Sequence, residues 1–243
     1  MIIQRTSISV TYKKIEGIKK AYYNNEEMLR EYFNEATVLP IPDDAPLEIP
    51  RIIIKTLHEH GQLNISPIIA TFEIHYDEGF ERDWVSCEKY IEERMSKVFE
   101  FLNILTNNSY EYIGLVSNIL YDDVKSNGAK FIADRLLNSD KISDIYDVNI
   151  RYTFVERDNI FVNILLQNAR MFKTGLDITK AGALCQANQT AESIGAVIDI
   201  NDRYGFNNTP EYKSNSINLN NLLHCMSNII NNKLKRLIND GEY

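Results

Sequence analysis

Histidine and carboxylate side chains between residues 58 and 77 have the types and spacing that most readily suggest chemistry. Imidazole and carboxylate groups together can hold zinc or another divalent metal ion. Residues two apart on an extended chain point to the same side, so such ligands can share one face of a strand. The candidate metal ligands are His58, His60, His75 and Asp77.

The expected strand pairing argues against this metal site. If residues 51–57 and 67–77 pair as a hairpin, His58 and His60 lie near its turn and His75 lies near its far end. Strand residues rise about 3.3 Å each, so the two ends are roughly 35 Å apart. We therefore predict solvent-facing histidines near a turn, with no bound metal and no cofactor.

A polar row along residues 71–77 is the second candidate for chemistry. Its members are Thr71, Glu73, His75 and Asp77. If this row meets Arg151 and Thr153 of a later hairpin, the resulting wall can bind an anion or transfer protons. Alternation alone also produces such a row on any sheet with one face in water. We expect the row to face water, and a hydrolase that uses it remains the alternative.

The three cysteines have no sequence-local base that would activate a thiol. Cys87 and Cys225 fall on or beside apolar helical stripes, where a free cysteine behaves as a small buried hydrophobe. Cys185 lies in an irregular stretch and is the more accessible thiol. A nucleophilic thiolate needs a histidine or a helix N-terminus beside it, and His224 is the only histidine in the C-terminal half. A Cys/His nucleophile is therefore disfavoured.

Sequence motifs of the common enzyme classes are absent. The chain contains no G-x-x-x-x-G-K-[ST], no G-x-G-x-x-G, no G-x-S-x-G and no H-E-x-x-H. Residues 199–202, Asp-Ile-Asn-Asp, resemble part of a calcium loop but lack its glycine and its final glutamate. The sequence assigns no catalytic residue, and we expect a protein that is not an enzyme.

Hydrophobic periodicity predicts the elements that must position these side chains. Period-2 alternation predicts seven strands, and apolar residues spaced by three and four predict four helices. The expected strands are 7–12, 51–57, 68–76, 110–121, 148–154, 160–166 and 194–200, and the expected helices are 26–35, 84–102, 129–137 and 219–237.

The order of these elements favours an α+β fold. We predict a mainly antiparallel sheet with two long amphipathic helices packed on one face, in a single domain spanning residues 1–243. Each long helix follows strands that look like a hairpin pair, which suggests two similar halves at 48–121 and 146–240. The strand and short helix of residues 1–36 lie outside these halves.

Composition narrows the possible partners. The formal net charge of -8 argues against broad binding to nucleic-acid phosphates and against docking on anionic lipid. We find no apolar window of 18 residues, no signal peptide and no C-x-x-C spacing, so we expect a cytoplasmic protein. Because sheet edges need cover, we also predict a homodimer.

Two stretches resemble a known group of proteins. Residues 42–51 read PDDAPLEIPR and lead into an isoleucine-rich strand, and residues 196–201 read AVIDIN before a polar loop and an amphipathic helix. Together they resemble a sporadically distributed bacterial family of similar length and uncharacterised function, over most of the chain from about residue 40. The resemblance implies an α+β fold and a bacterial accessory-gene setting, and it implies no active-site residues.

These observations favour a binding protein. We predict a non-enzymatic macromolecule-binding or regulatory protein whose partner is another protein, in a bacterial defence or toxin-control setting. The polar residues 202–215 are suited to recognition as a mobile loop. Two alternatives remain: a metal-dependent or acid–base hydrolase with a nonstandard site, and a small-molecule sensor with a pocket between sheet and helices.

Overall fold

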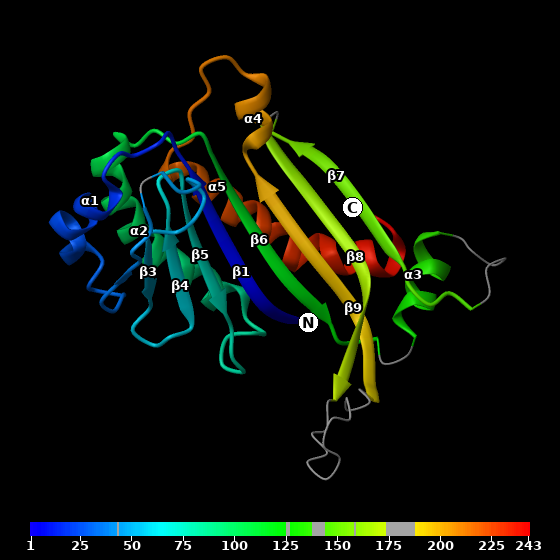
Figure 1. The fold of residues 1–243 in the computed structure, drawn as a ribbon. Coiled ribbons are helices and arrows are strands. Elements are labelled where there is room, and N and C mark those ends of the chain that lie inside the picture. The colour runs from blue at the N-terminus through cyan, green and yellow to red at the C-terminus, as the bar shows by residue number, and fades with distance from the viewer. Residues whose placement is uncertain (43, 125–126, 138–143, 158, 174–187) are drawn as a thin grey trace, which may run out of the picture.

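A single large antiparallel sheet organises the molecule (Figure 1). The computed structural model describes all residues except 43, 125–126, 138–143, 158 and 174–187. In this described part, nine strands pair in the order β2-β3-β4-β5-β1-β6-β9-β8-β7, which confirms the α+β class with an antiparallel sheet. The strands are β1 (Ile2–Thr11), β2 (Thr37–Val38), β3 (Ile52–Lys55), β4 (Gly61–Ile65), β5 (Ile69–His75), β6 (Tyr112–Tyr121), β7 (Asn149–Glu156), β8 (Ile160–Lys173) and β9 (Asn188–Asn201).

Helices cover one face of this sheet and leave the other face open. Figure 1 shows α2 and α5 passing behind the strands, while α4 lies beyond one end of them. The helices are α1 (Ile18–Asn25), α2 (Trp84–Thr106), α3 (Gly128–Leu136), α4 (Arg203–Asn208), α5 (Ser216–Asn228) and α6 (Leu234–Asp240). A 3₁₀ turn spans Glu26–Met28, and a π-helical turn joins α5 to α6 at Ile229–Lys233. Among the described helices, none is both long and apolar enough to cross a membrane.

The core lies between the sheet and its helices. Alternate residues of the central strands, such as Ile8 and Phe72, are fully buried on the helix side. The apolar stripe of α2 meets them with Ile91, Met95 and Val98, which are buried as the helical spacing predicts. Each such side chain contributes about 1.5–3 kcal/mol on burial. This one-sided core fixes which face of every strand remains open.

The sheet has two unequal edges. The β2 edge is only two residues long, and a segment containing Pro40, Pro42, Pro46 and Pro50 follows it. Arg51, whose side chain is buried, ties this segment down by donating hydrogen bonds to the carbonyl oxygens of Ile49 (2.7 Å) and Ala45 (3.1 Å). The opposite edge strand, β7, is eight residues long.

Several predicted elements differ from the observed ones. The helix expected at residues 26–35 is wrong, because α1 ends before it and only a 3₁₀ turn follows. Strand β4 was not expected, and it separates β3 from β5, which were predicted to pair directly. The single C-terminal helix expected at 219–237 is divided by the π-helical turn. Residues 202–215 include α4 and are not an irregular loop.

Candidate functional site

Rows of side chains run across the open face of the sheet, because opposed residues of an antiparallel pair share one face. The strand register places three such rows side by side. The central row is Thr153–Asn163–Asp199–Val116–Ser7–Glu73–Gln62–Lys55. On one side of it lies Arg151–Leu165–Val197–Asn118–Arg5–His75, and on the other lies Val155–Phe161–Asn201–Gly114–Ser9–Thr71–Asn64–Ile53.

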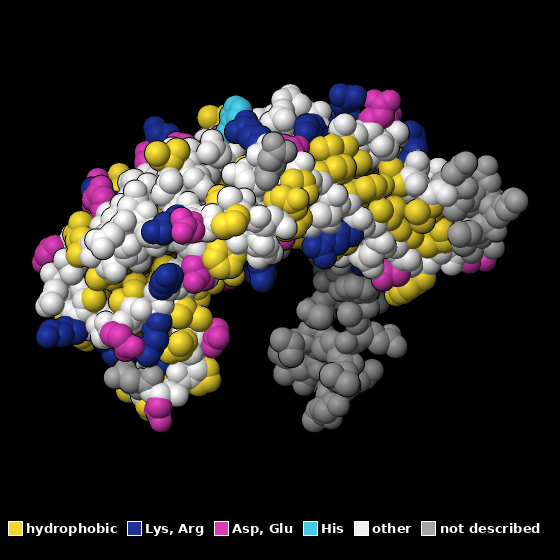
Figure 2. Space-filling view, turned by 90° about the horizontal axis from the view of Figure 1, so that it is seen from above, with side chains coloured by type: hydrophobic (Ala, Val, Ile, Leu, Met, Phe, Trp, Pro, Cys, Tyr) yellow, Lys and Arg dark blue, Asp and Glu magenta, His cyan; other side chains and the backbone are white. Residues whose placement is uncertain are grey.

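This open face is hollow and mostly uncharged. Figure 2, which looks down on the strand ends, shows the molecule bent into an arch, and the side facing the viewer in Figure 1 lies inside the bend. Serine, threonine, asparagine and glutamine alternate with scattered apolar residues in the three rows. Besides His75, the charged or titratable members are Arg5, Lys55, Arg151, Glu73 and Asp199, so the signs nearly balance although the whole chain carries -8. The face therefore offers hydrogen bonds rather than a strong field.

Hydrogen bonds hold part of this face in place. The Asn163 Oδ1 atom accepts hydrogen bonds from Thr153 Oγ1 (2.8 Å) and from Arg151 Nη2 (3.1 Å). Asn163 Nδ2 donates in turn to Asp199 Oδ2 (3.3 Å), and Asn201 Nδ2 donates to Asp199 Oδ1 (2.9 Å). These polar groups thus have a defined arrangement before any partner binds.

The structure does not bring residues 71–77 together with Arg151 and Thr153. Glu73 and Thr153 do face the same side, but β1, β6, β9 and β8 lie between their strands. Five strand spacings separate the two by about 24 Å. No small substrate reaches both, whereas an extended macromolecule does.

The histidines lie much closer together than the hairpin interpretation predicted. Because β4 pairs with β5, the backbone N–H of His75 donates to the carbonyl of His60 at 2.9 Å. His60 Nε2 is also 3.6 Å from Asp77 Oδ2. The unexpected strand β4 therefore brings His60, His75 and Asp77 to one corner of the open face, while His58 is exposed in the turn before β4.

Two small hollows adjoin this histidine corner. One, lined by His60, His75, Asp77 and Tyr90, has a volume of about 10 Å³, which is room for about one water molecule. The other has a volume of about 160 Å³ and is lined by Lys55, Glu59, His60, Gly61, Gln62, Glu73 and His75. Among the described residues, no three His, Cys, Asp or Glu side chains are grouped so as to hold a metal ion.

The described cysteines are buried and unreactive. Burial raises the pKa of the Cys87 thiol to about 12. Burial and the adjacent carboxylate of Glu156 likewise raise the pKa of Cys225 to about 12. His224 is exposed on α5. Cys185 lies outside the described residues.

A buried carboxylate organises residues 202–215. Asp202 is 1% exposed, and its Oδ1 atom accepts the backbone N–H of Ile113 at 2.6 Å. Its Oδ2 atom accepts hydrogen bonds from Ser214, Tyr212 and Asn218. Asp199 and Asn201 lie on the open face, so the three polar residues of 199–202 do not converge on one calcium ion.

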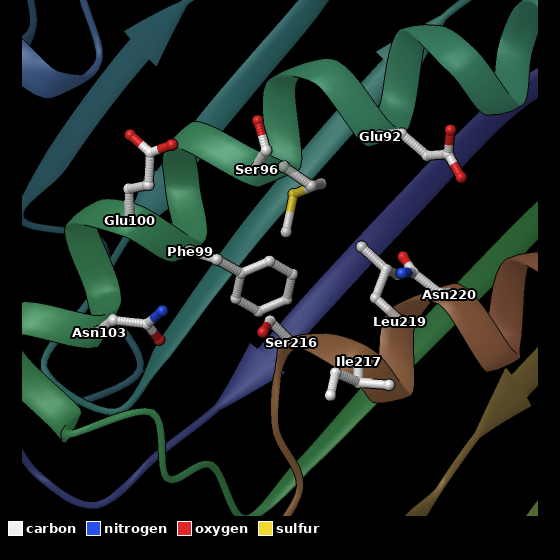
Figure 3. Close-up of a pocket in the computed structure, with 10 residues that line it drawn as sticks. Glu92, Ser96, Phe99, Glu100, Asn103, Ser216, Ile217, Leu219 and Asn220 are labelled. Carbon is white, nitrogen blue, oxygen red and sulfur yellow. The ribbon is translucent and has the colours of Figure 1, made fainter.

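A groove runs between α2 and α5 on the helix side (Figure 3). Phe99 points from α2 toward α5, and Glu92 and Glu100 lie along α2. Met95 and Leu219 also line the groove. Its volume is about 530 Å³. The groove lies between two helices rather than between helix and sheet, where the predicted sensor pocket was expected.

No protein-family profile matches the chain, and no curated protein has significant sequence similarity to it. The proposed function below is based on the geometry of the open face.

Proposed function

We propose that this chain is a non-enzymatic protein-binding protein, and that the hollow open face of its sheet receives the partner. The observation that carries this proposal is the set of three rows of mostly polar side chains with apolar residues among them, held on a curved sheet and left uncovered by the helices. An antiparallel sheet commonly has one face in water. Neutral polar groups with scattered apolar residues are typical of protein interfaces, which are depleted of charge at their centre.

The distribution of charge on the open face argues against nucleic acid as the partner. Phosphate backbones are bound through clustered lysine and arginine, which release counterions. The three rows carry Arg5, Lys55 and Arg151 far apart on different strands, with Glu73 and Asp199 between them. This distribution favours a partner with mixed, mostly neutral contacts.

A pair of matched substitutions tests the proposal. Ser9→Arg places a long cation at the centre of the open face, and Ile217→Arg places the same group on the helix side, where Ile217 is 66% exposed. Complexes of the wild-type chain are purified from its native host, and the partner is then bound as a purified protein. We expect Ser9→Arg to weaken its affinity at least tenfold and Ile217→Arg to leave it unchanged.

The opposite pattern, or equal affinity for both variants, contradicts the proposal. Urea denaturation of both variants confirms that a lost partner reflects the surface and not unfolding. A partner that is lost only with Ile217→Arg would instead identify the α2–α5 groove as the interface.

A second candidate function is supported by the histidine corner. His60 beside Asp77, with His75, Glu73 and Lys55 around a hollow of about 160 Å³, provides groups for general acid–base hydrolysis. His60→Gln should then abolish turnover of a responsive substrate, whereas His58→Gln, in the exposed turn, should not. Equal activity of the two variants would reject this site.

The predicted internal duplication is also part of this proposal. It is supported by the strand order, which proceeds outward from the central β1–β6 pair as β5, β4, β3 on one side and β9, β8, β7 on the other. This symmetry favours halves that begin at β1 and β6 instead of at residues 48 and 146. The resemblance to a sporadic bacterial family, the defence or toxin-control setting and the cytoplasmic location remain predictions, and the identified partner would test the setting.

A further inference from the structure

The long edge strand β7 lacks the features that protect sheet edges. Natural edges are kept from pairing by short strands, prolines, lysines or bulges. The β2 edge has two residues and is followed by prolines, but β7 has eight residues without proline, lysine or a register shift. One edge of the described sheet is therefore open to another strand.

The backbone of β7 presents its free groups at odd-numbered residues. Asn168 donates its N–H to the carbonyl of Val148, so Val148 faces β8. Backbone direction alternates along a strand as the side chains do. The N–H and C=O groups of Asn149, Arg151, Thr153 and Val155 consequently point away from β8, at the free edge.

Apolar side chains accompany this free edge. Figure 2 shows a band of hydrophobic side chains on the part of the molecule that holds β7. Val155 is 47% exposed, and Tyr152 stacks on Phe154 with ring centroids 6.3 Å apart. Phe154 stacks in turn on Tyr243 at 3.8 Å. An apolar band beside unpaired backbone groups favours burial by a strand over exposure to water.

The sequence around β7 is complementary to itself. In a two-fold antiparallel pair centred on Tyr152, all four outward-facing residues lie opposite outward-facing residues of a second copy. The same pairing brings Asp147, just before β7, near Arg157 of the second copy, which lies in the turn after β7 with φ 51°, and the symmetry axis repeats this pair. Both side chains are exposed and carry opposite charge. Tyr152 meets its own copy on the helix side, where non-hydrogen-bonded pairs bring side chains closest.

We propose that a second copy of this chain docks on β7, through a two-fold antiparallel β7–β7 pair that joins the two sheets into one. Because opposed residues share a face, the open faces of both copies then lie on the same side. This inference goes beyond the proposed function, since it concerns the edge and not the interior of the open face.

Substitutions at Thr153 test the backbone pairing. Thr153→Pro removes an outward-facing N–H, which costs the β7–β8 ladder nothing, and proline is tolerated on edge strands. It removes two intermolecular hydrogen bonds from the dimer, one for each copy. Thr153→Ala keeps the N–H and loses the same hydroxyl bond to Asn163, so it is the matched control. Sedimentation equilibrium should show a dimer for wild type and Thr153→Ala, and a dissociation constant about thirtyfold weaker for Thr153→Pro.

Charge reversal tests the register separately. Asp147→Arg and Arg157→Asp should each weaken the dimer, because each places like charges opposite one another at both ends of the pair. The double variant should restore the wild-type dissociation constant. This rescue remains informative if Thr153→Pro fails to fold.

Three results would overturn the proposal. The first is a wild-type chain that stays monomeric up to hundreds of micromolar. The second is a dimer that folded Thr153→Pro leaves unchanged. The third is a double charge-reversal variant that dimerises no more tightly than the single variants. That result would mean that the two copies pair in another register or through another surface.

Discussion

The buried carboxylate of Asp202 holds several segments of the fold together through hydrogen bonds. Its two oxygens accept hydrogen bonds from β6, from the segment before α5 and from α5 itself. Four donors thus share one buried carboxylate as their acceptor, and Asn218 Nδ2 also donates to the hydroxyl of Tyr212 (2.9 Å). Gly205 leaves room for this arrangement, since a Cβ there would lie 2.7 Å from the ring of Tyr212.

We expect Asp202→Ala to lower the free energy of unfolding by about 3 kcal/mol, because buried donors without acceptors keep their full desolvation cost. Urea denaturation measures this loss. Asp199→Ala, on the open face, is the control and should cost less than about 1 kcal/mol. Equal losses would show that Asp202 is not the anchor of residues 202–215.

The ionised carboxylates of two glutamates should contribute to the stability of the fold with opposite sign. Burial alone would raise the pKa of Glu156, but hydrogen bonds from Tyr243 and Lys233 outweigh it and hold the pKa below its usual value. Its ionised form therefore stabilises the fold above the unfolded pKa of about 4.3, and this contribution is lost as the pH falls through the folded pKa. Burial and the nearby Glu92 raise the pKa of Glu88, so ionised Glu88 destabilises the fold at neutral pH.

Glutamine variants of these two glutamates should differ in their free energy of unfolding at pH 7 and have more similar values in acid. Glu156→Gln should lower the free energy of unfolding at pH 7, and Glu88→Gln should raise it. Both differences should be smaller at about pH 3, because protonation of the carboxyls as the pH falls removes the charge on which each difference depends. Urea titrations at the two pH values measure this. A loss for Glu156→Gln that persists unchanged at low pH would show that its charge is not the cause.

At the scale of elements, the start of α3 packs directly against the backbone of β9. A Cβ on Gly128 would lie 2.6 Å from the carbonyl oxygen of Ser193, which is backbone and cannot swing aside. Gly128→Ala should therefore destabilise the protein by about 1–3 kcal/mol. Gly114→Ala on β6 is the matched control, since its nearest contact would be an ordinary 3.7 Å, and it should be close to neutral. Thermal unfolding of the two variants measures the difference.

Element positions were predictable where periodicity was long and unbroken. The apolar stripe of α2 and the alternation of β7 and β8 were each sufficient to place those elements. Strand β4 was missed although Leu63 and Ile65 alternate with polar residues, because five residues give a weak signal next to the longer runs around them. The short helix α1 was placed too late in the chain, since only Ile18 and Tyr22 are buried along it and its apolar stripe is short.

At the scale of the whole molecule, the candidate site was not predictable from the residues alone. The sequence shows that Ser7, Glu73, Val116 and Asp199 belong to open faces of strands. It does not show that these strands are neighbours, because that depends on pairing between residues more than one hundred apart, as for β1 with β6. The same limit applies to the distance between the histidines. That distance was overestimated because strand β4, which pairs with β5, was not predicted.

The unequal edges of the sheet also determine how far such molecules could assemble. At one end, the edge strand β2 is only two residues long, and Arg51 ties down the proline-containing segment that follows it. At the other end, no described strand pairs with the outer edge of β7. A chain with two free edges can polymerise without limit into a fibre. In a chain with one free edge, pairing with a first partner leaves no edge for a second partner. Growth by strand addition would then stop at two copies, however high the concentration.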